Sequence, residues 1–403
     1  MNILVVSQFF YPDDFRINDI AKELAADGHH VEVLTGLPDY ATSRIPSEYR
    51  FFRKRKETVD GVHITRVPTI ARRRGILFRM LNYLSFVISG CLYARFCKFR
   101  ADVVLSCETS PVLQVMPAIT YKKRRHVPLV IYCCDIWPEC LKVWGVKESS
   151  LLFRLMHKRS NRIFQSGDVV PYSSLPFHAY LRDVNGMPED KLVYLPQHAE
   201  DMFCPNASGV GDGRVHFGFA GNIGAAQQVD CLVRAAALLP TDKPFMVHIF
   251  GDGSERENCE RLAEELGVTE RVVFRGKFPV TAMPRLYSEL DCFILTMMGG
   301  GVGSATLPAK MQGYISAGKP VLAAADGASA DFISQVDCGL SVPAGDSEGL
   351  AQAMLQVIDD PAAFRRKGEN GRRYYEENFT KDIFMKRLYA ILDKVIRHTK
   401  ESQ

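Results

Sequence analysis

A lysine occupies the first turn of a predicted helix in LPAKMQGYISAGKPVLAA, residues 307–324. We expect this helix to begin at Pro308, where the missing N–H of proline costs nothing, and to end at Gly318. Because the amino end of a helix carries partial positive charge, the Lys310 ammonium is unfavourable there unless an anion lies nearby. The stretch therefore indicates an anion site, with a solvent-facing lysine as the ordinary alternative.

Two glycine-rich turns in the same half of the chain strengthen this indication. FAGNIGAAQQVDCLVRAA (219–236) is typical of a strand, a tight turn and a helix. GGGVGSATLPAK (299–310) follows another predicted strand and carries Ser304 and Thr306 before the lysine. Free N–H groups at helix starts suit phosphate. One such turn could be a plain strand-to-helix connection, but two turns with a lysine favour the diphosphate of a nucleotide.

Carboxylates follow a predicted strand in the first half of the chain. In YCCDIWPEC (132–140), Asp135 ends the strand and Glu139 lies four residues further on. A carboxylate at a strand end can act as the base for a hydroxyl, or orient it, during group transfer. The alternatives are a helix cap for Asp135 and a core position for Trp137.

A second polar stretch, FYPDDFRINDIA (10–21), follows the first predicted strand. Its Arg16 and Asn18 are expected at the same edge of the sheet as Asp135, with a helix N-cap as the alternative role of Asn18. Other nucleotide motifs are missing: there is no GxxxxGK[ST], no GxGxxG opens the chain, and no DxD triplet occurs. A diphosphate held by helix ends and a lysine does not require a metal.

Alternating strands and helices must position these groups. Apolar runs such as ILVVS (3–7) alternate with amphipathic stretches such as INDIAKELAADG (17–28), and the pattern restarts at HFGFAG (216–221). Such alternation indicates parallel sheets covered on both faces, with ligands at the carboxyl ends of the strands. We predict an α/β protein of two doubly wound, Rossmann-like domains facing a cleft. Its expected parts are residues 1–196, a linker at 197–214, residues 215–380 and a last helix at 381–403.

Length and composition agree with a globular enzyme. The 403 residues exceed one ordinary core, and 47% are hydrophobic and 24% charged. Eleven cysteines without a CxxC spacing indicate reduced thiols rather than a disulfide framework or a zinc site. The chain starts directly as a strand, so we expect no signal peptide and a cytoplasmic location.

Charge is distributed unevenly. Residues 1–200 hold 28 Lys and Arg against 20 Asp and Glu, a charge of +8, and the remainder holds 22 against 26, a charge of −4. The basic excess is clustered, including at 50–56, 72–74 and 122–125. It could coat solvated faces or bind anionic lipid or nucleic acid. The nucleic-acid alternative is the weakest, because the basic runs lack interleaved stacking aromatics.

An apolar stretch, MLNYLSFVISGCLYA (80–94), lies between Arg79 and Arg95. It is shorter than the roughly 20 residues that span a bilayer. We expect either a buried helix or a helix at the membrane interface, where flanking arginines reach phosphate head groups.

Taken together, these stretches resemble glycosyltransferase family 4, the retaining nucleotide-sugar transferases of GT-B fold. The resemblance is closer to the bacterial surface-polysaccharide branch of the L-fucosamine transferase type. The similar stretches run in order along nearly the whole chain: PDDFRINDIAKELAADGHHVEVLTGLPDY (12–40), LNYLSFV (81–87), CDIWPE (134–139), YLPQHAEDMF (194–203), FAGNIGAAQ (219–227), FGDGSE (250–255) and LPAKMQGYISAGKPVLA (307–323).

The resemblance implies a role for each domain. The first would bind a polyprenyl-diphosphate-linked acceptor at the inner face of the membrane, in contact with anionic lipid. The second would bind a nucleotide sugar, expected to be a UDP-sugar, without a metal or other cofactor. The last helix would cross back to the first domain. The leaving phosphate would help to take the acceptor proton, so no strong protein base is obligatory.

The residues expected to carry these roles fall into four sets. The catalytic candidates are Asp135 and Glu139. The donor-binding candidates are Gly221, Asn222, Ile223, Gly224, Gln227, Lys277, Ser304, Thr306, Leu307, Pro308 and Lys310. The acceptor-binding candidates are Arg16, Asn18 and Tyr40. The membrane-facing candidates are Arg72, Arg73, Arg74 and Arg79.

The chain also departs from the family pattern. Many members carry two glutamates separated by seven residues, the second of which holds the donor ribose, but Ala305 and Gly313 stand at these positions. Asn222 and Gln227 replace an arginine and a lysine of the first phosphate turn. Two other functions therefore compete with a transferase: a GT-B nucleotide-sugar epimerase and a non-catalytic nucleotide-binding scaffold.

Overall fold

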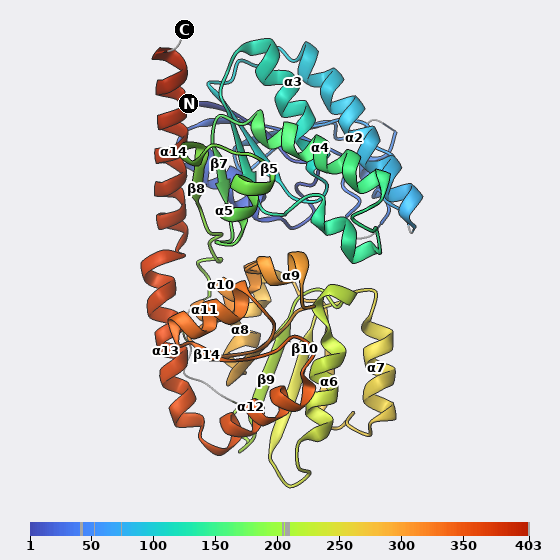
Figure 1. The fold of residues 1–403 in the computed structure, drawn as a ribbon, viewed down its shortest axis with the longest axis vertical. Coiled ribbons are helices and arrows are strands. Elements are labelled where there is room, and N and C mark those ends of the chain that lie inside the picture. Colours follow the sequence, from blue (N-terminus) through green and yellow to red (C-terminus); the bar gives the residue numbers. More distant parts are fainter. Residues whose placement is uncertain (41–42, 52, 74, 204, 206–209, 402–403) are drawn as a thin grey trace. The chain divides into compact units, whose positions relative to one another are not determined.

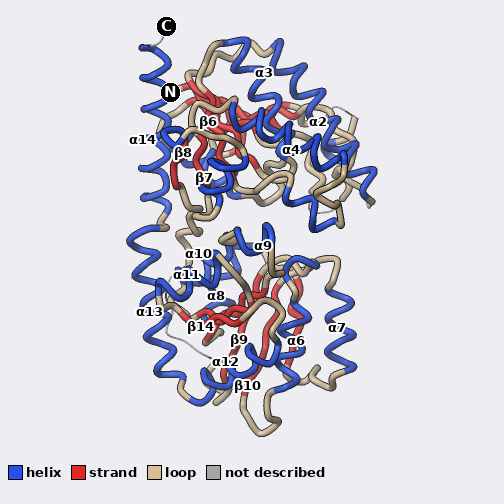
Figure 2. Tube along the Cα trace, in the orientation of Figure 1, coloured by secondary structure: helices blue, strands red, loops and turns tan. Residues whose placement is uncertain are grey.

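The structure is a computed structural model that describes residues 1–40, 43–51, 53–73, 75–203, 205 and 210–401. Its residues fall into two compact units (Figures 1 and 2). Unit 1 comprises Met1–Ser173, Phe177–Leu195 and Met385–Gln403, and unit 2 comprises Ser174–Pro176 and Pro196–Phe384. Most of the last helix is thus grouped with unit 1.

Unit 1 is built on an eight-stranded sheet in the order β3-β4-β2-β1-β5-β6-β7-β8. Neighbouring strands are parallel except β3 and β4. The strands are β1 (Asn2–Val6), β2 (His30–Thr35), β3 (Lys56–Val59), β4 (Val62–Arg66), β5 (Val103–Glu108), β6 (Leu129–Cys133), β7 (Val170–Tyr172) and β8 (Leu192–Tyr194).

Helices cover this sheet, and short turns of 3-10 or π type connect several elements. The helices of unit 1 are α1 (Arg16–Ala26), α2 (Ile76–Phe96), α3 (Met116–Arg125), α4 (Leu151–Gln165), α5 (Phe177–Ala179) and most of α14 (Lys381–Glu401). The shorter turns are η1 (Ser47–Tyr49), η2 (Val112–Val115), η3 (Glu139–Trp144), η4 (Tyr180–Val184) and η5 (Glu189–Lys191).

Unit 2 is built on a six-stranded, wholly parallel sheet in the order β11-β10-β9-β12-β13-β14. Its strands are β9 (Val215–Ala220), β10 (Phe245–Phe250), β11 (Val272–Gly276), β12 (Cys292–Thr296), β13 (Val321–Ala324) and β14 (Gly339–Val342). Strands β9, β12 and β13 are buried along their whole length, which explains their continuous apolar sequences.

Two helical layers sandwich this sheet (Figure 1). One layer contains α6 (Val229–Leu238), α7 (Arg256–Glu265) and α12 (Ser347–Asp359), and the other contains α8 (Met283–Ser288), α10 (Ala309–Ser316), α11 (Ala328–Val336) and α13 (Pro361–Asn378). The remaining short elements of unit 2 are α9 (Gly301–Ala305), η6 (Ala225–Gln227) and η7 (Val280–Ala282).

Strand order locates the ligand edge of each sheet. Chain order reverses between β1 and β5 in unit 1 and between β9 and β12 in unit 2. Ligands of doubly wound sheets bind at such reversals, outside the carboxyl ends of the strands. The predicted pair of parallel, Rossmann-like α/β units is confirmed.

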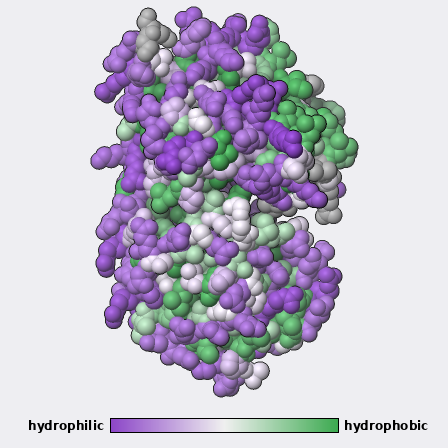
Figure 3. Space-filling model, viewed as in Figure 1, coloured by the Kyte–Doolittle hydropathy of each residue, from purple (hydrophilic) through white to green (hydrophobic). Residues whose placement is uncertain are grey.

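Helix α2 is longer than the predicted 80–94 segment and is not a simple core helix. Leu77–Phe96 is long and apolar enough to cross a membrane by length and composition, and 28% of its most apolar window is buried. Apolar side chains gather on the surface over α2 (Figure 3). The exposed members at intervals of three to four residues are Leu77, Met80, Leu84, Ile88, Leu92 and Phe96.

The described cysteines and acids hold neither a disulfide nor an obvious metal site. Ten cysteines in the described ranges are unpaired, as expected of reduced thiols. Across the same ranges, no group of three or more His, Cys, Asp or Glu side chains is placed to hold a metal ion.

Candidate functional site

The turn after β9 and the turn after β10 both contain glycine, and they pack directly against each other at the carboxyl edge of the unit 2 sheet. The Gly221 N–H donates to the Phe250 carbonyl (2.9 Å), and the Ile223 N–H donates to the Asp252 carbonyl (2.9 Å). A Cβ atom at Gly251 would lie 1.8 Å from the Gly221 oxygen. The turn after β10 must therefore contain glycine for the turn after β9 to take this shape. This explains why GDGS follows β10.

The loop after β12 is tied to the same place. The Met298 N–H donates to the Ala226 carbonyl (2.8 Å), and the Thr296 hydroxyl donates to the Gln227 carbonyl (2.5 Å). These bonds hold the turn after β9 and the loop after β12 together at the point where the strand order reverses.

The predicted donor residues Ser304 and Thr306 stabilise this loop locally. The Ser304 hydroxyl accepts from the Gly300 N–H (2.8 Å), and the Thr306 hydroxyl donates to the Val302 carbonyl (2.7 Å). Both bonds close the single turn of α9. Any contact with a ligand would use the remaining hydrogen-bonding capacity of these hydroxyls.

Tyr314, which sequence reasoning missed, fixes α10 against β9. Its hydroxyl donates to the Ala220 carbonyl (3.0 Å) and accepts from the Ala220 N–H (2.8 Å). Its ring stacks on Phe293, with centroids 4.2 Å apart. Burial raises the pKa of this phenol, so it stays a neutral donor and acceptor. Tyr314 lies four residues after Lys310 on α10, so the same bonds position the lysine one turn away.

The Lys310 ammonium lies over the first glycine turn. Its Nζ is 4.2 Å from the centroid of the Phe219 ring, and a Cβ atom at Gly221 would be only 3.2 Å from it. Nζ is buried and has no hydrogen-bond partner among the described residues, although the rest of the side chain is partly exposed. Burial lowers the pKa of this ammonium to about 7. A desolvated, unpaired cation at a helix start favours an anionic ligand.

The other predicted donor residues lie at or near this turn. The side chains of Asn222 and Gln227 bridge it, with the Asn222 side-chain amide donating to the Gln227 side-chain oxygen Oε1 (2.9 Å). Gly224 faces this pair: a Cβ atom there would lie 2.6 Å from the Asn222 amide nitrogen. Ile223 is buried in the core. Lys277 is exposed just after β11, two strands away from β9.

The start of α10 differs slightly from the prediction. The helix begins at Ala309, and Pro308 is its N-cap residue in an extended conformation. Leu307 is buried, and its N–H donates to the Ser174 hydroxyl (3.0 Å), a residue grouped with unit 2. Gly313, where many family members carry the ribose-binding glutamate, faces the Phe203 ring, which would lie 3.7 Å from a Cβ atom at this glycine.

In unit 1, Asp135 follows β6 as predicted, and its carboxylate is held by three donors. Oδ2 accepts from the Ser110 hydroxyl (2.5 Å), and Oδ1 accepts from the Cys140 thiol (2.9 Å) and the Ile136 N–H (3.2 Å). Burial raises the pKa of Asp135, and these hydrogen bonds oppose that shift. The geometry suits a carboxylate that orients a hydroxyl better than a free base.

The second catalytic candidate, Glu139, is engaged by its neighbours. One oxygen accepts from the Tyr180 hydroxyl (3.1 Å), and the other lies 2.6 Å from Lys142 Nζ. Glu139 is therefore held within unit 1 by Tyr180 and Lys142.

Glu108 is a further acid that the sequence interpretation missed. It ends β5, one residue beyond the predicted strand ADVVLSC, and is fully buried. Neither carboxyl oxygen of Glu108 accepts a well-formed hydrogen bond from the described residues. Burial, followed by the charge of Asp135, raises the pKa of Glu108 well above its usual value. A polar residue closing a buried strand was the signal that could have revealed it.

The predicted acceptor residues gather near the start of α1. The helix begins at Arg16 with Phe15 as its N-cap, so the alternative N-cap role for Asn18 is wrong. The Asn18 amide instead donates to the Asp13 carbonyl (2.7 Å), and the Asp13 carboxylate accepts from the Tyr40 N–H (3.0 Å). These bonds join the segment after β1 to the segment after β2.

Of the predicted membrane-facing arginines, Arg74 lies outside the described residues. Arg73 is exposed, with its guanidinium 5.4 Å from the Phe78 centroid. Arg79 is partly exposed on α2. Arg72 lies instead on aromatic rings, with its guanidinium carbon 4.5 Å from the Tyr40 centroid.

Two family models divide the chain in the same way as the structure does. The glycosyl transferase 4-like domain matches residues 15–198, and the glycosyl transferases group 1 model matches residues 205–374. The chain is built of two glycosyltransferase domains. Unit 1 contains the 4-like domain, and unit 2 contains the group 1 domain.

Individual relatives are more distant. LpsE of Rhizobium meliloti, a lipopolysaccharide core biosynthesis glycosyltransferase, is 30% identical over 151 residues, which cover 38% of this chain and 42% of that protein. WbjE of Pseudomonas aeruginosa, a probable glycosyltransferase, is 25% identical over 316 residues, which cover 75% of this chain and 76% of that protein. The match spans about four-tenths of the length of the first curated relatives.

A solved structure shows the shared fold. HepE of Anabaena in complex with UDP superimposes with a TM-score of 0.72 at 14% identity, covering 98% of this chain and 100% of that chain. The GT-B fold is therefore confirmed. The L-fucosamine transferase type stays a prediction.

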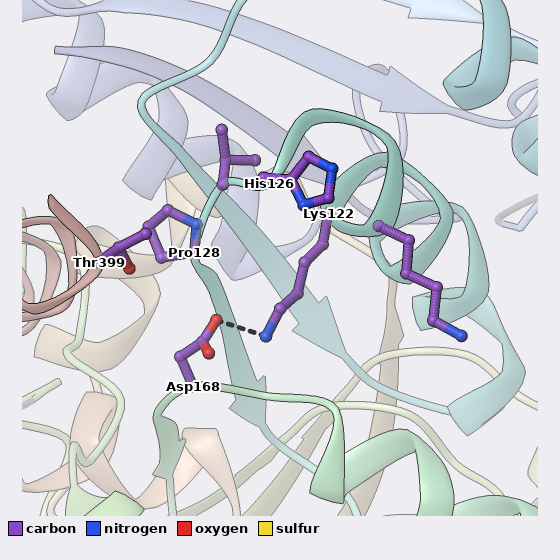
Figure 4. Close-up of a pocket in the computed structure, with 7 residues that line it drawn as sticks. Lys122, His126, Pro128, Asp168 and Thr399 are labelled. Carbon is purple, nitrogen blue, oxygen red and sulfur yellow. Dashed lines mark hydrogen bonds and ion pairs between the residues drawn. The ribbon is translucent and has the colours of Figure 1, made fainter. Parts of the chain in front are cut away.

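A pocket of about 400 Å³ in unit 1 lies away from these groups (Figure 4). It is found where β6 begins, so it is at the amino edge of the sheet rather than the ligand edge. Lys122 Nζ is 2.7 Å from the Asp168 carboxylate, which also accepts from the Leu129 N–H (2.7 Å). Thr399 of α14 lines the same pocket. This hollow is explained by the packing of α14 against the 4-like domain.

The glycine requirement of the group 1 domain can be tested directly. Gly251→Ala would place Cβ against the Gly221 oxygen, so it should displace the β9 turn and lower the free energy of unfolding by about 3 kcal/mol in chemical denaturation. Gly267→Ala is the matched control, because Gly267 also has a positive φ (+67°) but nothing within 4 Å of the added Cβ. The control should cost about 1 kcal/mol of stability. Equal losses of stability in the two variants would contradict the requirement for glycine where the two turns meet.

Proposed function

We propose that this chain is a retaining glycosyltransferase. It takes a sugar from a UDP-sugar and transfers it to a lipid-linked glycan acceptor, a polyprenyl-diphosphate-linked sugar, during synthesis of a bacterial surface polysaccharide. Support comes from the two glycosyltransferase domains, the relationship to a lipopolysaccharide core enzyme and the fold shared with a UDP complex. N-acetyl-L-fucosamine is the first donor sugar to test.

The observation that carries the proposal is the unpaired Lys310 ammonium beside Gly221. In the proposed complex the donor diphosphate lies at the β9 turn and the start of α10, where it meets this cation and the free N–H groups of the turn. As charge develops on the leaving phosphate, the ammonium stabilises it without a large reorganisation, because Tyr314 already fixes α10.

The chemical step then needs few protein groups. The acceptor hydroxyl oxygen forms a bond to the anomeric carbon on the face from which UDP departs. The bond from that carbon to the β-phosphate oxygen breaks, and its electron pair leaves with UDP. The hydroxyl proton passes to the leaving phosphate oxygen. Asp135 orients the acceptor hydroxyl and is itself held by Ser110 and Cys140.

The protein is proposed to work at the inner face of the cell membrane. The exposed α2 stripe (Leu77, Met80, Leu84, Ile88, Leu92 and Phe96) offers an apolar surface, and Arg73 and Arg79 flank its beginning. Such a helix can lie in the interface while the arginines contact anionic head groups. Peripheral binding would place the enzyme where a lipid-linked acceptor is found.

Lys310→Met tests the donor site. Loss of one charge-assisted contact should weaken UDP binding by about 1.5–3 kcal/mol, roughly 10- to 150-fold in Kd. In the unliganded protein burial lowers the pKa of Lys310 to about 7, and a bound diphosphate should raise this pKa. UDP binding at pH 8 should therefore take up protons, and affinity should fall as pH rises above about 7.

Calorimetry at pH 8 in two buffers of different ionisation enthalpy measures both effects. Lys319→Met is the matched control, because burial also lowers the pKa of that partly buried lysine, but it lies three residues beyond the carboxyl end of α10. In Lys310→Met the proton uptake should vanish and the affinity should fall, whereas both should persist in the control. Unchanged UDP affinity in Lys310→Met would remove the basis of the donor site.

Asp135→Asn separates a transferase from a scaffold. Transfer should fall by at least about 100-fold while UDP affinity stays unchanged, because the hydroxyl is no longer oriented by a carboxylate. The readout is the surface polysaccharide of a cell that lacks the native gene and carries the variant, with melting curves to confirm folding. Glu139→Gln is the control and should retain most activity. Full polysaccharide synthesis by Asp135→Asn would favour the non-catalytic scaffold.

The membrane surface is tested by Ile88→Glu combined with Leu92→Glu. These side chains are 69% and 59% exposed, so the change should leave the melting temperature nearly unchanged. Sedimentation with phosphatidylglycerol vesicles should be lost. Leu238→Glu, at a 55% exposed leucine on α6 of the other domain, should sediment like the wild type. Retained sedimentation of the α2 double variant would contradict the interface.

A further inference from the structure

Buried hydrogen bonds fix the backbone of Arg72 at the carboxyl edge of the 4-like domain's sheet. The Arg72 N–H donates to the Asp39 carboxylate (2.8 Å), which also accepts from the Asn82 amide of α2 (2.9 Å). The same amide donates to the Ile70 carbonyl (2.7 Å), and the Ile70 N–H donates to the Ser85 hydroxyl (2.9 Å). This irregular segment is therefore held in place from α2 and from the residues after β2.

The Arg72 side chain lies on a cluster of aromatic rings. Its guanidinium carbon is 4.5 Å from the Tyr40 centroid and 5.6 Å from the Phe9 centroid. The centroids of those two rings are 4.9 Å apart with the ring planes inclined at 61°, and the Phe15 centroid lies 4.8 Å from that of Tyr40. The planar guanidinium is thus oriented by stacking before any ligand arrives.

No carboxylate forms an ion pair with this guanidinium among the described residues. Arg66, for comparison, forms an ion pair in which its guanidinium nitrogen lies 2.6 Å from a carboxylate oxygen of Glu57. Asp39 interacts electrostatically with Arg72, but its Oδ2 accepts from the Arg72 backbone N–H, and burial raises the pKa of Asp39 to about 6. The Tyr83 hydroxyl is a neutral hydrogen-bond partner of the guanidinium and occupies only part of its five N–H groups. Guanidinium N–H groups of Arg72 therefore remain available to donate hydrogen bonds to a ligand.

We propose that Arg72, with the Tyr40 ring beside it, binds a phosphate or diphosphate group at the ligand edge of the 4-like domain. The fork of a guanidinium matches phosphate oxygens in a bidentate contact, which a lysine cannot reproduce. Tyr40 is 46% exposed and offers a ring face to the adjoining part of the ligand. Phe9 follows β1, which borders the reversal of strand order, and Tyr40 follows β2, the strand next to β1.

Two molecules could supply this phosphate: the acceptor diphosphate or a membrane lipid head group. We favour the acceptor, and that choice rests on the proposed function. Arg72 is partly buried on rings, whereas its neighbour Arg73 projects into solvent as a lipid contact would require. The site then determines how the acceptor's diphosphate, rather than its sugar, is recognised.

The test uses the full chain carrying Lys310→Met, which weakens the proposed donor site, and inorganic pyrophosphate as the probe. Calorimetry at pH 7 should show one remaining binding site. Adding Arg72→Gln should raise its Kd at least tenfold, and adding Arg72→Lys should do nearly the same because the fork and the stacking are lost. Arg73→Gln, the matched control at the exposed neighbour, should leave pyrophosphate binding unchanged.

Either of two results would overturn the site. The first is no pyrophosphate binding once Lys310 is replaced. The second is an equal loss of pyrophosphate affinity in Arg72→Gln and Arg73→Gln, which would indicate only a diffuse basic surface. If Arg72→Gln does not melt cooperatively, Arg72→Lys decides the question, since it keeps the charge. UDP binding by the wild-type chain reports separately on the proposed function.

Vesicles distinguish the two phosphate sources. Arg72→Gln should still sediment with phosphatidylglycerol vesicles if the acceptor supplies the phosphate. Loss of both pyrophosphate and vesicle binding would keep the phosphate site and assign it to a head group. Loss of vesicle binding with intact pyrophosphate binding would refute the proposal.

Discussion

The group 1 domain buries the Lys310 ammonium against a polypeptide turn, where no described residue forms a hydrogen bond with it. Lys310 reaches the Gly221 turn only because Gly251 permits the close approach of two backbones and Tyr314 ties α10 to Ala220. Each of these contacts could be satisfied without a lysine. Burial of the ammonium is unfavourable in the unliganded protein, as its lowered pKa indicates. The surrounding contacts therefore preserve a locally costly arrangement, which is typical of a ligand site.

The 4-like domain differs from the group 1 domain, because the ligand edge of its sheet contains many buried hydrogen-bond acceptors. Asn82 donates to Asp39 and accepts from the Gln8 amide (2.8 Å), and the Gln8 N–H donates to the Gln114 side chain (2.9 Å). Gln114 then donates to Thr109, next to the Ser110 that binds Asp135. One line of hydrogen bonds thus runs across the carboxyl ends of the strands from α2 to β6. It fixes the polar groups and leaves the guanidinium of Arg72 without a carboxylate partner among the described residues.

The sequence revealed the architecture because parallel sheets need continuous apolar strands and glycine turns, and both are local patterns. The turn at Gly221 and the lysine at the start of α10 were predictable for the same reason. Tyr314 was not, because its role depends on a contact with Ala220, 94 residues away. Glu108 was missed because an acid inside a buried strand contradicts the apolar pattern that defines strands. The orientation of Arg72 depends on rings from two separate segments, which no local pattern contains.

Under the proposed function, the charge distribution would require each domain to bind its anion in a different way. Residues 201–403 carry a formal charge of −4, so their net charge does not attract a nucleotide diphosphate. With Asn222 and Gln227 in the first turn, a diphosphate there depends on local N–H groups and on Lys310 rather than on long-range attraction. Residues 1–200 carry +8, which favours encounter with anionic surfaces but gives little selectivity between one phosphate and another. Selectivity in that domain must come from an oriented group, and a guanidinium fixed on aromatic rings provides a directional contact where the diffuse basic surface cannot.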